Sequence, residues 1–347
     1  MSTRPALPFL SQTGRAATPV AFVNGILAAY RHYGREAAAA LEKAHIPPAI
    51  LGEPAARVTA GQFEILSEAA MRELDDEALG WFSRPLPWGA YGMLCRASIG
   101  APDLGVALKR WRRHHAILTQ DVLFDLSVDG DLARLAIEER RDLGEAREFC
   151  LVTLLRYVLG FSCWAIDSAI PLRAASFPFA EPAHVGVYPA IFCKGLAFGA
   201  SRAELAFDAR YLGLPLKRDE RDLDVMLKRA LPLTVLPYRR DRLLVERIRR
   251  LLRDPARRFA GADELAASLA LSTRTLHRRL EAEGASLREL KEEARIDLAK
   301  RALARGNTPI KRVAHLAGFR NAKSFARAFR SWTGQTPSSF RDRRAGA

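Results

Sequence analysis

The sequence lacks the residue patterns that chemistry at a metal, a reactive thiol or a nucleophile needs. Its 347 residues include only four cysteines, Cys95, Cys150, Cys163 and Cys193, and none of them forms a C-x-x-C pair. They lie in apolar surroundings, which predicts buried free thiols in a reducing compartment and argues against a disulfide framework. No P-loop, G-x-S-x-G or H-E-x-x-H motif occurs. The sequence therefore predicts no enzyme, no metal site and no cofactor.

Long uninterrupted hydrophobic runs are also missing. Residues 1–20 hold no continuous apolar core of the kind that a secretory signal needs. The most membrane-like stretch, residues 149–170, is interrupted by Arg156, Ser162, Asp167 and Ser168. It predicts a buried helix rather than a membrane span. We expect a cytoplasmic protein without a membrane partner.

The first two thirds of the chain lack any charge excess. Residues 1–238 contain 27 basic and 27 acidic side chains, whereas residues 239–347 contain 27 basic and 12 acidic ones. The whole net charge of +15 therefore belongs to the last third. A basic domain attracts phosphate and releases counterions when it binds DNA. A charge excess alone is equally compatible with a solvated surface, so its meaning depends on the motifs that coincide with it.

A helix-turn-helix pattern occupies residues 263–284. Residues 263–269 predict a short helix, residues 270–272 a turn, and residues 273–283 a second helix that Ser272 caps and Gly284 ends. Leu276 and Leu280 face inward. The outward face carries Thr273, Arg274, His277 and Arg278. Arginine can contact guanine edges and phosphates, and threonine can contact thymine methyl groups, so this helix has the side chains for reading a DNA groove.

A second unit occupies residues 309–333 and follows a linker helix over residues 286–304. In the linker, Leu287, Leu290, Ala294, Leu298 and Ala302 recur at three- and four-residue steps, which predicts one apolar stripe. Its 19 residues span roughly 28 Å at 1.5 Å per residue, close to the ~34 Å between successive major-groove faces. Asn321 caps the second recognition helix. Its outward positions are Ala322, Lys323, Arg327 and Arg330, where plain solvent exposure is an equal alternative for Lys323 and Arg330.

The order of residues in these two units resembles one known family. The pattern reads Gly318-Phe319-x-Asn321-x-x-x-Phe325-x-Arg327-x-Phe329, then Gly334-x-x-Pro337-x-x-Phe340-Arg341. It is similar to the signature of the AraC/XylS family of bacterial transcription regulators, with Asn321 and Phe340 as mild departures from the usual Ser and Tyr. The resemblance covers about residues 240–341. It implies base-reading roles for Arg274, His277 and Arg278 in the first helix and for Ala322, Lys323 and Arg327 in the second. Because Ala322 cannot donate a hydrogen bond from its side chain, we expect the second helix to read less sequence.

The amino-terminal part, residues 20–215, predicts a mixed α+β domain. Strands at 122–128 and 132–138 alternate apolar and polar residues around Asp129-Gly130, which favours a hairpin with a type I′ turn. This part resembles the arabinose-binding type of domain found in one branch of the same family. The matching pieces are Ile46-Pro-Pro-x-x-Leu51, Val58-x-x-x-Gln62-Phe63, Leu79-Gly80, Tyr91-Gly-Met-Leu94, Leu104-Gly-x-Ala107-Leu108 and Ala203-x-Leu205-x-Phe207-Asp208. The resemblance implies effector sensing and allows dimerisation. Residues 216–238 are then an interdomain connection, and residues 239–343 form an all-α DNA-binding domain.

An effector site cannot be located from the sequence alone. The best candidates are Arg110, Trp111 and His114, where cations could hold a carboxylate while the indole packs against its chain. The alternative is a helix with Trp111 buried and the cations in solvent. His114 and His115 are adjacent in a predicted helix and do not share a face, which argues against zinc.

Three functions compete at this stage. The leading hypothesis is an effector-responsive transcription regulator, with activation favoured by the resemblance alone. Its expected partners are double-stranded promoter DNA, RNA polymerase, a small-molecule effector and a second copy of the chain. When it is bound to DNA, we expect it to be associated with the nucleoid. An alkyl-transfer enzyme would need an activated cysteine beside basic residues, and no Pro-Cys-His-Arg segment occurs. A constitutive architectural protein, whose first domain only dimerises, remains the third hypothesis.

Overall fold

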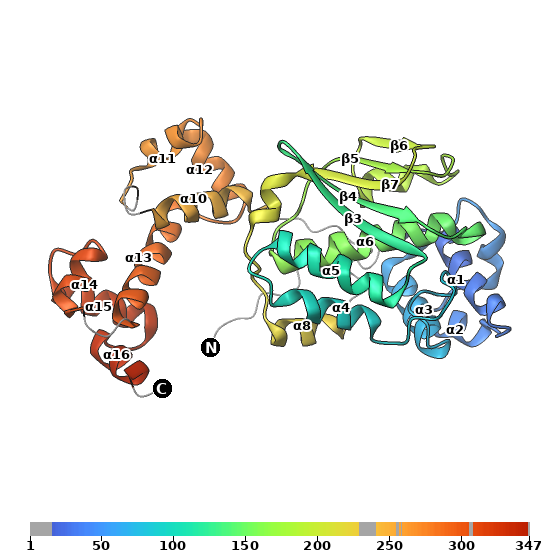
Figure 1. Cartoon of the computed structure of the whole chain (residues 1–347), viewed down its shortest axis with the longest axis horizontal. Helices are drawn as coiled ribbons and strands as arrows, with labels where there is room; N and C mark the ends of the chain where they lie inside the picture. Colours follow the sequence, from blue (N-terminus) through green and yellow to red (C-terminus); the bar gives the residue numbers. More distant parts are fainter. Residues whose placement is uncertain (1–15, 229–240, 255–256, 258, 305–307, 346–347) are drawn as a thin grey trace. The chain divides into compact units, whose positions relative to one another are not determined.

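The computed structural model describes residues 16–228, 241–254, 257, 259–304 and 308–345, and the chain divides into two compact units, Met1–Asp241 and Arg242–Ala347. The first unit is mixed α and β and the second is helical, which agrees with the predicted fold class (Figure 1). Part of the predicted interdomain connection, residues 229–238, lies outside the described residues. So do Arg239 and Arg240, the first two residues of the predicted DNA-binding domain.

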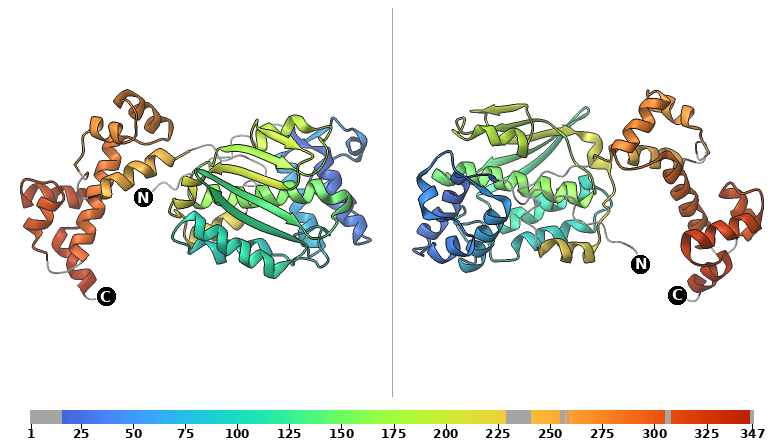
Figure 2. Two further views of the ribbon diagram at one scale, coloured as in Figure 1. Left: turned by 45° about the horizontal axis from the view of Figure 1, so that its top comes forward. Right: turned by 180° about the vertical axis from the view of Figure 1, so that it is seen from behind.

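The helices of the first unit are α1 (Val20–His32), α2 (Ala38–Lys43), α3 (Ala60–Glu73), α4 (Ala90–Ile99), α5 (Leu104–Leu118), α6 (Arg147–Ala165), α7 (Tyr188–Ile191) and α8 (Glu220–Leu227). Its strands are β1 (Ala16–Pro19), β2 (Arg57–Thr59), β3 (Val122–Asp129), β4 (Leu132–Glu139), β5 (Leu172–Phe177), β6 (Leu196–Phe198) and β7 (Ala203–Asp208). β1 pairs with β2, and the other five form a sheet in the order β3-β4-β7-β5-β6, antiparallel except for β5 and β6. Figure 2 shows α5 and α6 against this sheet.

Helix α6 forms the centre of the first unit. With the turn before it, α6 has the length and apolarity of a membrane span, but 89% of its most apolar window is buried inside the unit. Arg156 accounts for the interruption seen in the sequence. Its side chain is buried and donates a hydrogen bond to the Ile191 carbonyl at 2.7 Å. Burial lowers the pKa of Arg156 to about 10. The prediction of a buried core helix is therefore confirmed.

The β3–β4 hairpin is present, but its turn differs from the prediction. Asp129 pairs with Leu132, so the two loop residues are Gly130 and Asp131. Only Gly130 has a positive φ, 57°. A type I′ turn needs positive φ at both central residues, whereas type II′ needs it at the first alone. The expected type I′ turn was wrong because the glycine occupies the first loop position and the aspartate the second.

The second unit consists of α10 (Leu243–Arg253), α11 (Ala262–Ser268), α12 (Thr273–Ala282), α13 (Leu287–Ala304), α14 (Ile310–Leu316), α15 (Ala322–Thr333) and α16 (Pro337–Ala345). These helices enclose two separate apolar cores. The buried members of the first core are Leu244, Val245, Ile248, Leu252, Ala260, Leu265, Ala266, Leu276, Leu280, Leu287 and Leu290. The second core consists of Ala299, Ala302, Leu303, Val313, Ala314, Ala317, Phe325 and Phe329.

Helix α13 contributes to both cores. Leu287 and Leu290 pack in the first core, and Ala299, Ala302 and Leu303 pack in the second. At roughly 100° per residue, the nine residues from Leu290 to Ala299 leave the helix rotated by half a revolution. The predicted single stripe includes Ala302 but misses Ala299 and Leu303. It was incomplete because the two ends of α13 bury partly different faces.

Candidate nucleic-acid interface and sensor cavity

The first candidate recognition helix, α12, is held by local signals at both ends. The Ser272 side chain caps it by accepting a hydrogen bond from the Thr275 N–H at 3.2 Å. The turn before it places Ala270 at φ 54°, and Gly284 after it has φ 72°. Leu276 and Leu280 are fully buried. These contacts fix which face of α12 is turned outward.

Three of the four predicted outward side chains of α12 have no polar partner among the described residues. Arg274, His277 and Arg278 are exposed, and within the described part of the chain none of them forms a hydrogen bond or an ion pair. Thr273 differs, because it is half-buried and its hydroxyl donates to Asp263 Oδ1 at 2.5 Å. Thr273 thus ties α12 to α11, which leaves its methyl group as the part suited to a base contact.

The second candidate recognition helix, α15, repeats this construction. Asn321 caps it by accepting from the Ser324 N–H at 2.8 Å. Phe325 and Phe329 are fully buried, with ring centroids 5.6 Å apart. Lys323, Arg327 and Arg330 are exposed and form no hydrogen bond or ion pair with the described residues, while Ala322 is half-buried. Both helices therefore present cations that the described fold leaves available to a ligand.

Two contacts connect the halves of the second unit. The Trp332 indole N–H in α15 donates to Glu292 Oε1 in α13 at 2.6 Å. Gly318 has φ 78°, and a Cβ added there would lie 2.7 Å from Cε1 of Phe259. Glycine is therefore required at position 318 for two reasons, the left-handed backbone and the aromatic ring against it. These contacts support the spacing that α13 sets between α12 and α15.

The predicted effector candidates do not gather around one cavity in the described structure. Trp111 is buried and packs edge-on against Tyr91, with centroids 5.7 Å apart. His114 is half-buried, and its Nδ1 lies 2.7 Å from the Arg110 carbonyl oxygen. Arg110 is also half-buried. The three residues share one helix, α5, whose packing turns them in different directions.

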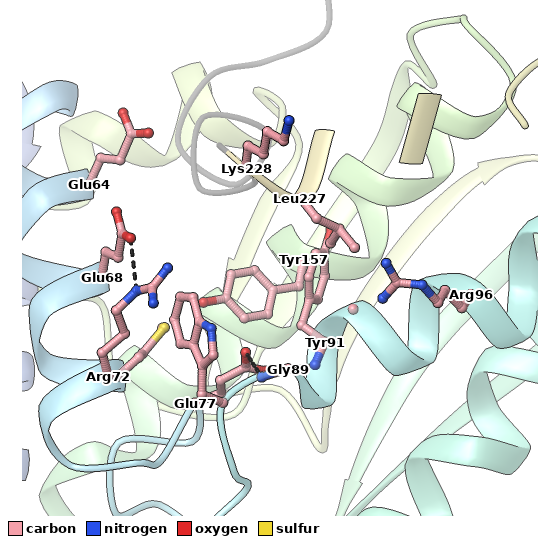
Figure 3. A pocket seen from close by; sticks show the side chains of 13 residues that line it. Glu64, Glu68, Arg72, Glu77, Gly89, Tyr91, Arg96, Tyr157, Leu227 and Lys228 are labelled. Atoms are coloured by element: carbon pink, nitrogen blue, oxygen red, sulfur yellow. Dashed lines mark hydrogen bonds and ion pairs between the residues drawn. The ribbon is translucent and has the colours of Figure 1, made fainter. Parts of the chain in front are cut away.

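A cavity of about 280 Å³ lies elsewhere in the first unit (Figure 3). It is bounded by side chains of α3, α4, α6 and α8 and of the loop before α4. Its lining is Glu64, Glu68, Met71, Arg72, Glu77, Trp88, Gly89, Tyr91, Gly92, Arg96, Tyr157, Leu227 and Lys228. Sequence reasoning missed this cavity, because these residues are distributed from position 64 to position 228. The one partial signal was the Tyr91-Gly-Met-Leu94 segment, which forms the start of α4.

The cysteines offer no reactive centre. Cys95, Cys150 and Cys163 are buried, as expected, whereas Cys193 is half-buried. Burial raises the pKa of the Cys163 thiol to about 11 and raises those of Cys95 and Cys150 as well. These thiols stay protonated at neutral pH. Among the described residues, no group of three or more His, Cys, Asp or Glu side chains is arranged to hold a metal ion.

Comparisons with known proteins match both units. Residues 34–216 match the family model of the arabinose-binding domain of AraC transcription regulators, and residues 265–343 match a helix-turn-helix domain model. The ornithine utilization regulator of Pseudomonas aeruginosa is 26% identical over 325 residues, which cover 93% of this chain and 96% of that protein. The transcriptional regulator VirS of Mycobacterium tuberculosis is 30% identical over 173 residues, 49% of each chain. The crystal structure of the regulator CdpR from Pseudomonas aeruginosa is 20% identical, covers 93% of this chain and 98% of its own, and gives a TM-score of 0.31.

Proposed function

Because the chain belongs to the AraC family of DNA-binding transcription regulators, we propose that it is an effector-responsive activator with two DNA-reading helices. In this proposal α12 and α15 enter adjacent segments of the major groove. The observation that supports it most is the repeated construction of the two helices. Each is capped by a side chain, packed on its own core and lined outside with cations that the described fold does not use.

The proposed roles differ between the two helices. Arg274, His277 and Arg278 read base edges from α12, since arginine pairs with guanine through two hydrogen bonds. Thr273 contributes an apolar contact through its methyl group. In α15, Lys323 and Arg327 read bases, Arg330 binds phosphate, and Ala322 allows close approach of the helix to the groove floor. Phosphate contacts position the protein, whereas base contacts supply its specificity.

In this proposal the first unit senses a small molecule, which shifts the protein between states that differ in DNA engagement. The similarity of nearly the whole chain to a regulator named for ornithine utilization supports a link to small-metabolite use. We also propose contact with RNA polymerase and homodimerisation through residues 20–215, in the cytoplasm. Family membership supports these last points.

Substitution of Arg278 tests the first reading helix. Arg278→Ala should weaken binding to the preferred site by about 1–3 kcal/mol and relax selectivity at one base pair, because a bidentate contact is lost. Binding is measured by titration of labelled DNA carrying the preferred site and each single-base variant. Arg113→Ala is the matched control, since Arg113 is an exposed arginine of the sensor unit without a partner among the described residues. A loss of equal size on all DNA sequences would show that Arg278 only anchors phosphate.

Arg327→Ala tests the second helix in the same assay. The expected result is a weaker footprint over one half of the site, with the other half retained. An unchanged footprint over both halves would contradict the assignment of Arg327.

A further inference from the structure

The cavity between α3, α4, α6 and α8 has the chemistry of a binding site for a particular class of molecule. We propose that it binds a small organic amine that carries a hydrogen-bond-accepting group at its other end. This inference rests on the proposed function, in that the amine is the effector. The charge around the cavity, its aromatic walls and a smaller chamber beside it favour such a ligand.

The charged side chains around the cavity leave Glu77 without a cation among the described residues. Three carboxylates, Glu64, Glu68 and Glu77, and three cations, Arg72, Arg96 and Lys228, line the cavity. Arg72 pairs with Glu68 at 2.9 Å, and Arg96 bonds Glu220 and Asp224. Asp75 and Asp76 add negative charge near Glu77. Glu77 is therefore the position that favours a positively charged ligand group.

Glu77 is the carboxylate at the inner end of this cavity. Its two oxygens accept hydrogen bonds from the Gly89 N–H at 2.7 Å and the Tyr91 N–H at 2.6 Å, which hold it in place. Burial raises the pKa of Glu77, and the neighbouring charges of Asp76 and Asp75 raise it further. An ammonium group beside Glu77 would offset both effects, because an opposite charge favours the ionised carboxylate.

The aromatic walls suit the same group. The rings of Tyr91 and Tyr157 lie 5.2 Å apart between centroids, and Trp88 forms the outer wall. The guanidinium of Arg72 already lies over the Trp88 ring, 4.3 Å from its centroid. An ammonium group among these rings gains the attraction between a cation and an aromatic face.

A smaller chamber of about 40 Å³ adjoins the cavity and shares Glu77, Tyr91 and Tyr157 with it. Its wall includes Trp81, Trp111 and His115, which are all at least 96% buried. The indole N–H groups and both His115 ring nitrogens have no hydrogen-bond partner within the described chain. Burial lowers the pKa of His115 to about 4, so it is neutral at pH 7. Two indole N–H groups and the one N–H of neutral His115 can each donate, so this chamber suits a ligand oxygen better than a second ammonium group.

The position of the cavity also suggests how binding is transmitted. Leu227 and Lys228, at the end of α8, form part of its wall, and Arg96 at its rim holds α8 through Glu220 and Asp224. A ligand in the cavity therefore contacts the last described helix of the first unit. Bound effector stabilises one arrangement of α8 against α4.

Thermal unfolding of the full chain tests the class of ligand. Four probes share one four-carbon length: 4-aminobutanoate, 1,4-diaminobutane, butane-1,4-diol and butanedioate. A ligand that binds only the folded state raises the unfolding temperature, and at equal concentration the ligand with the lower Kd raises it more. We expect the largest increase with 4-aminobutanoate, a smaller one with 1,4-diaminobutane, and none with butane-1,4-diol or butanedioate. No increase with either amine, or an equal increase with butanedioate, would overturn the proposal.

Variants then locate the site. Glu77→Gln should reduce the affinity for 4-aminobutanoate at least tenfold. Trp88→Leu removes an exposed aromatic wall without touching the α4 cap, and it should also reduce this affinity. Glu138→Gln is the control, because Glu138 is an exposed carboxylate on β4 that pairs with Arg140, outside the cavity. Trp111→Phe should remove the preference for 4-aminobutanoate over the diamine. Unchanged binding in both Glu77→Gln and Trp88→Leu overturns the site. DNA footprints measured without ligand decide the regulator function separately, so the two failures are distinguishable.

Discussion

Phe329→Ala should unfold the second helix-turn-helix unit and remove its half of the DNA footprint. Phe329 is fully buried and packs against Phe325 and Phe340, with centroid distances of 5.6 and 5.5 Å. Replacing a buried phenylalanine by alanine costs about 3–5 kcal/mol, through lost burial and the cavity left behind. The second core has eight buried residues, four of them alanine, so it has little stability to lose. The first core contains none of these residues and should keep α12 folded.

The footprint and the helix content measure this prediction together. We expect protection of one half-site and weaker overall binding. The loss of helical circular dichroism should correspond to the second helix-turn-helix unit alone. Leu316→Ala is the control, because Leu316 is 38% exposed in the same unit and its truncation should cost little. Simultaneous loss of protection at both half-sites would show that the two helix-turn-helix units unfold together, joined by the contacts of Trp332 and Phe259.

Asp76→Ala should destabilise the sensor unit by more than about 3 kcal/mol, because it leaves several buried donors without an acceptor. Asp76 is fully buried. Its Oδ1 accepts from the N–H groups of Ala78 and Leu86, at 2.9 and 2.8 Å. Its Oδ2 accepts from the Gly80 N–H at 2.6 Å and from the Tyr33 hydroxyl at 2.8 Å. One side chain thus organises the loop that carries Glu77 and Trp88 to the cavity.

Tryptophan fluorescence during urea unfolding measures this change. Four of the five tryptophans, Trp81, Trp88, Trp111 and Trp164, belong to the first unit, so the signal reports mainly on it. Asp125→Ala is the control, since Asp125 on β3 is half-exposed and pairs only with Arg112 of α5 among the described residues. We expect the unfolding midpoint of Asp76→Ala to fall strongly and that of the control to change little. Equal midpoints would contradict the role assigned to Asp76.

The parts of the fold that short sequence patterns specify could be predicted from the sequence. Ser272 and Asn321 cap α12 and α15 as expected, because a cap depends on residues within one turn. The burial of α6 and the pairing of β3 with β4 followed from apolar content and alternation. The turn type failed because it depends on which loop position the glycine occupies. The buried positions of α13 were predicted only in part, because its apolar residues serve two cores at different ends of the helix.

The candidate sites could likewise be predicted only where a short sequence pattern specifies them. The exposed cations of α12 and α15 were visible as positions on an amphipathic helix. The cavity was not, because it joins Glu64 of α3 to Lys228 after α8 and depends on how those helices pack. The predicted effector candidates in α5 formed a dense run in sequence, but adjacent helical residues point in different directions, so of the three only Trp111 lines the smaller chamber.

Hydroxyl-radical footprinting of the full chain tests the central claim of two reading helices most directly. The DNA is first selected from a random library by binding to the protein. The account predicts two protected segments on one face of the duplex, separated by about one helical turn of 10–10.5 base pairs. It also predicts that Arg278→Ala weakens one segment and Arg327→Ala the other. A single protected segment, or uniform protection without a selected sequence, would contradict it.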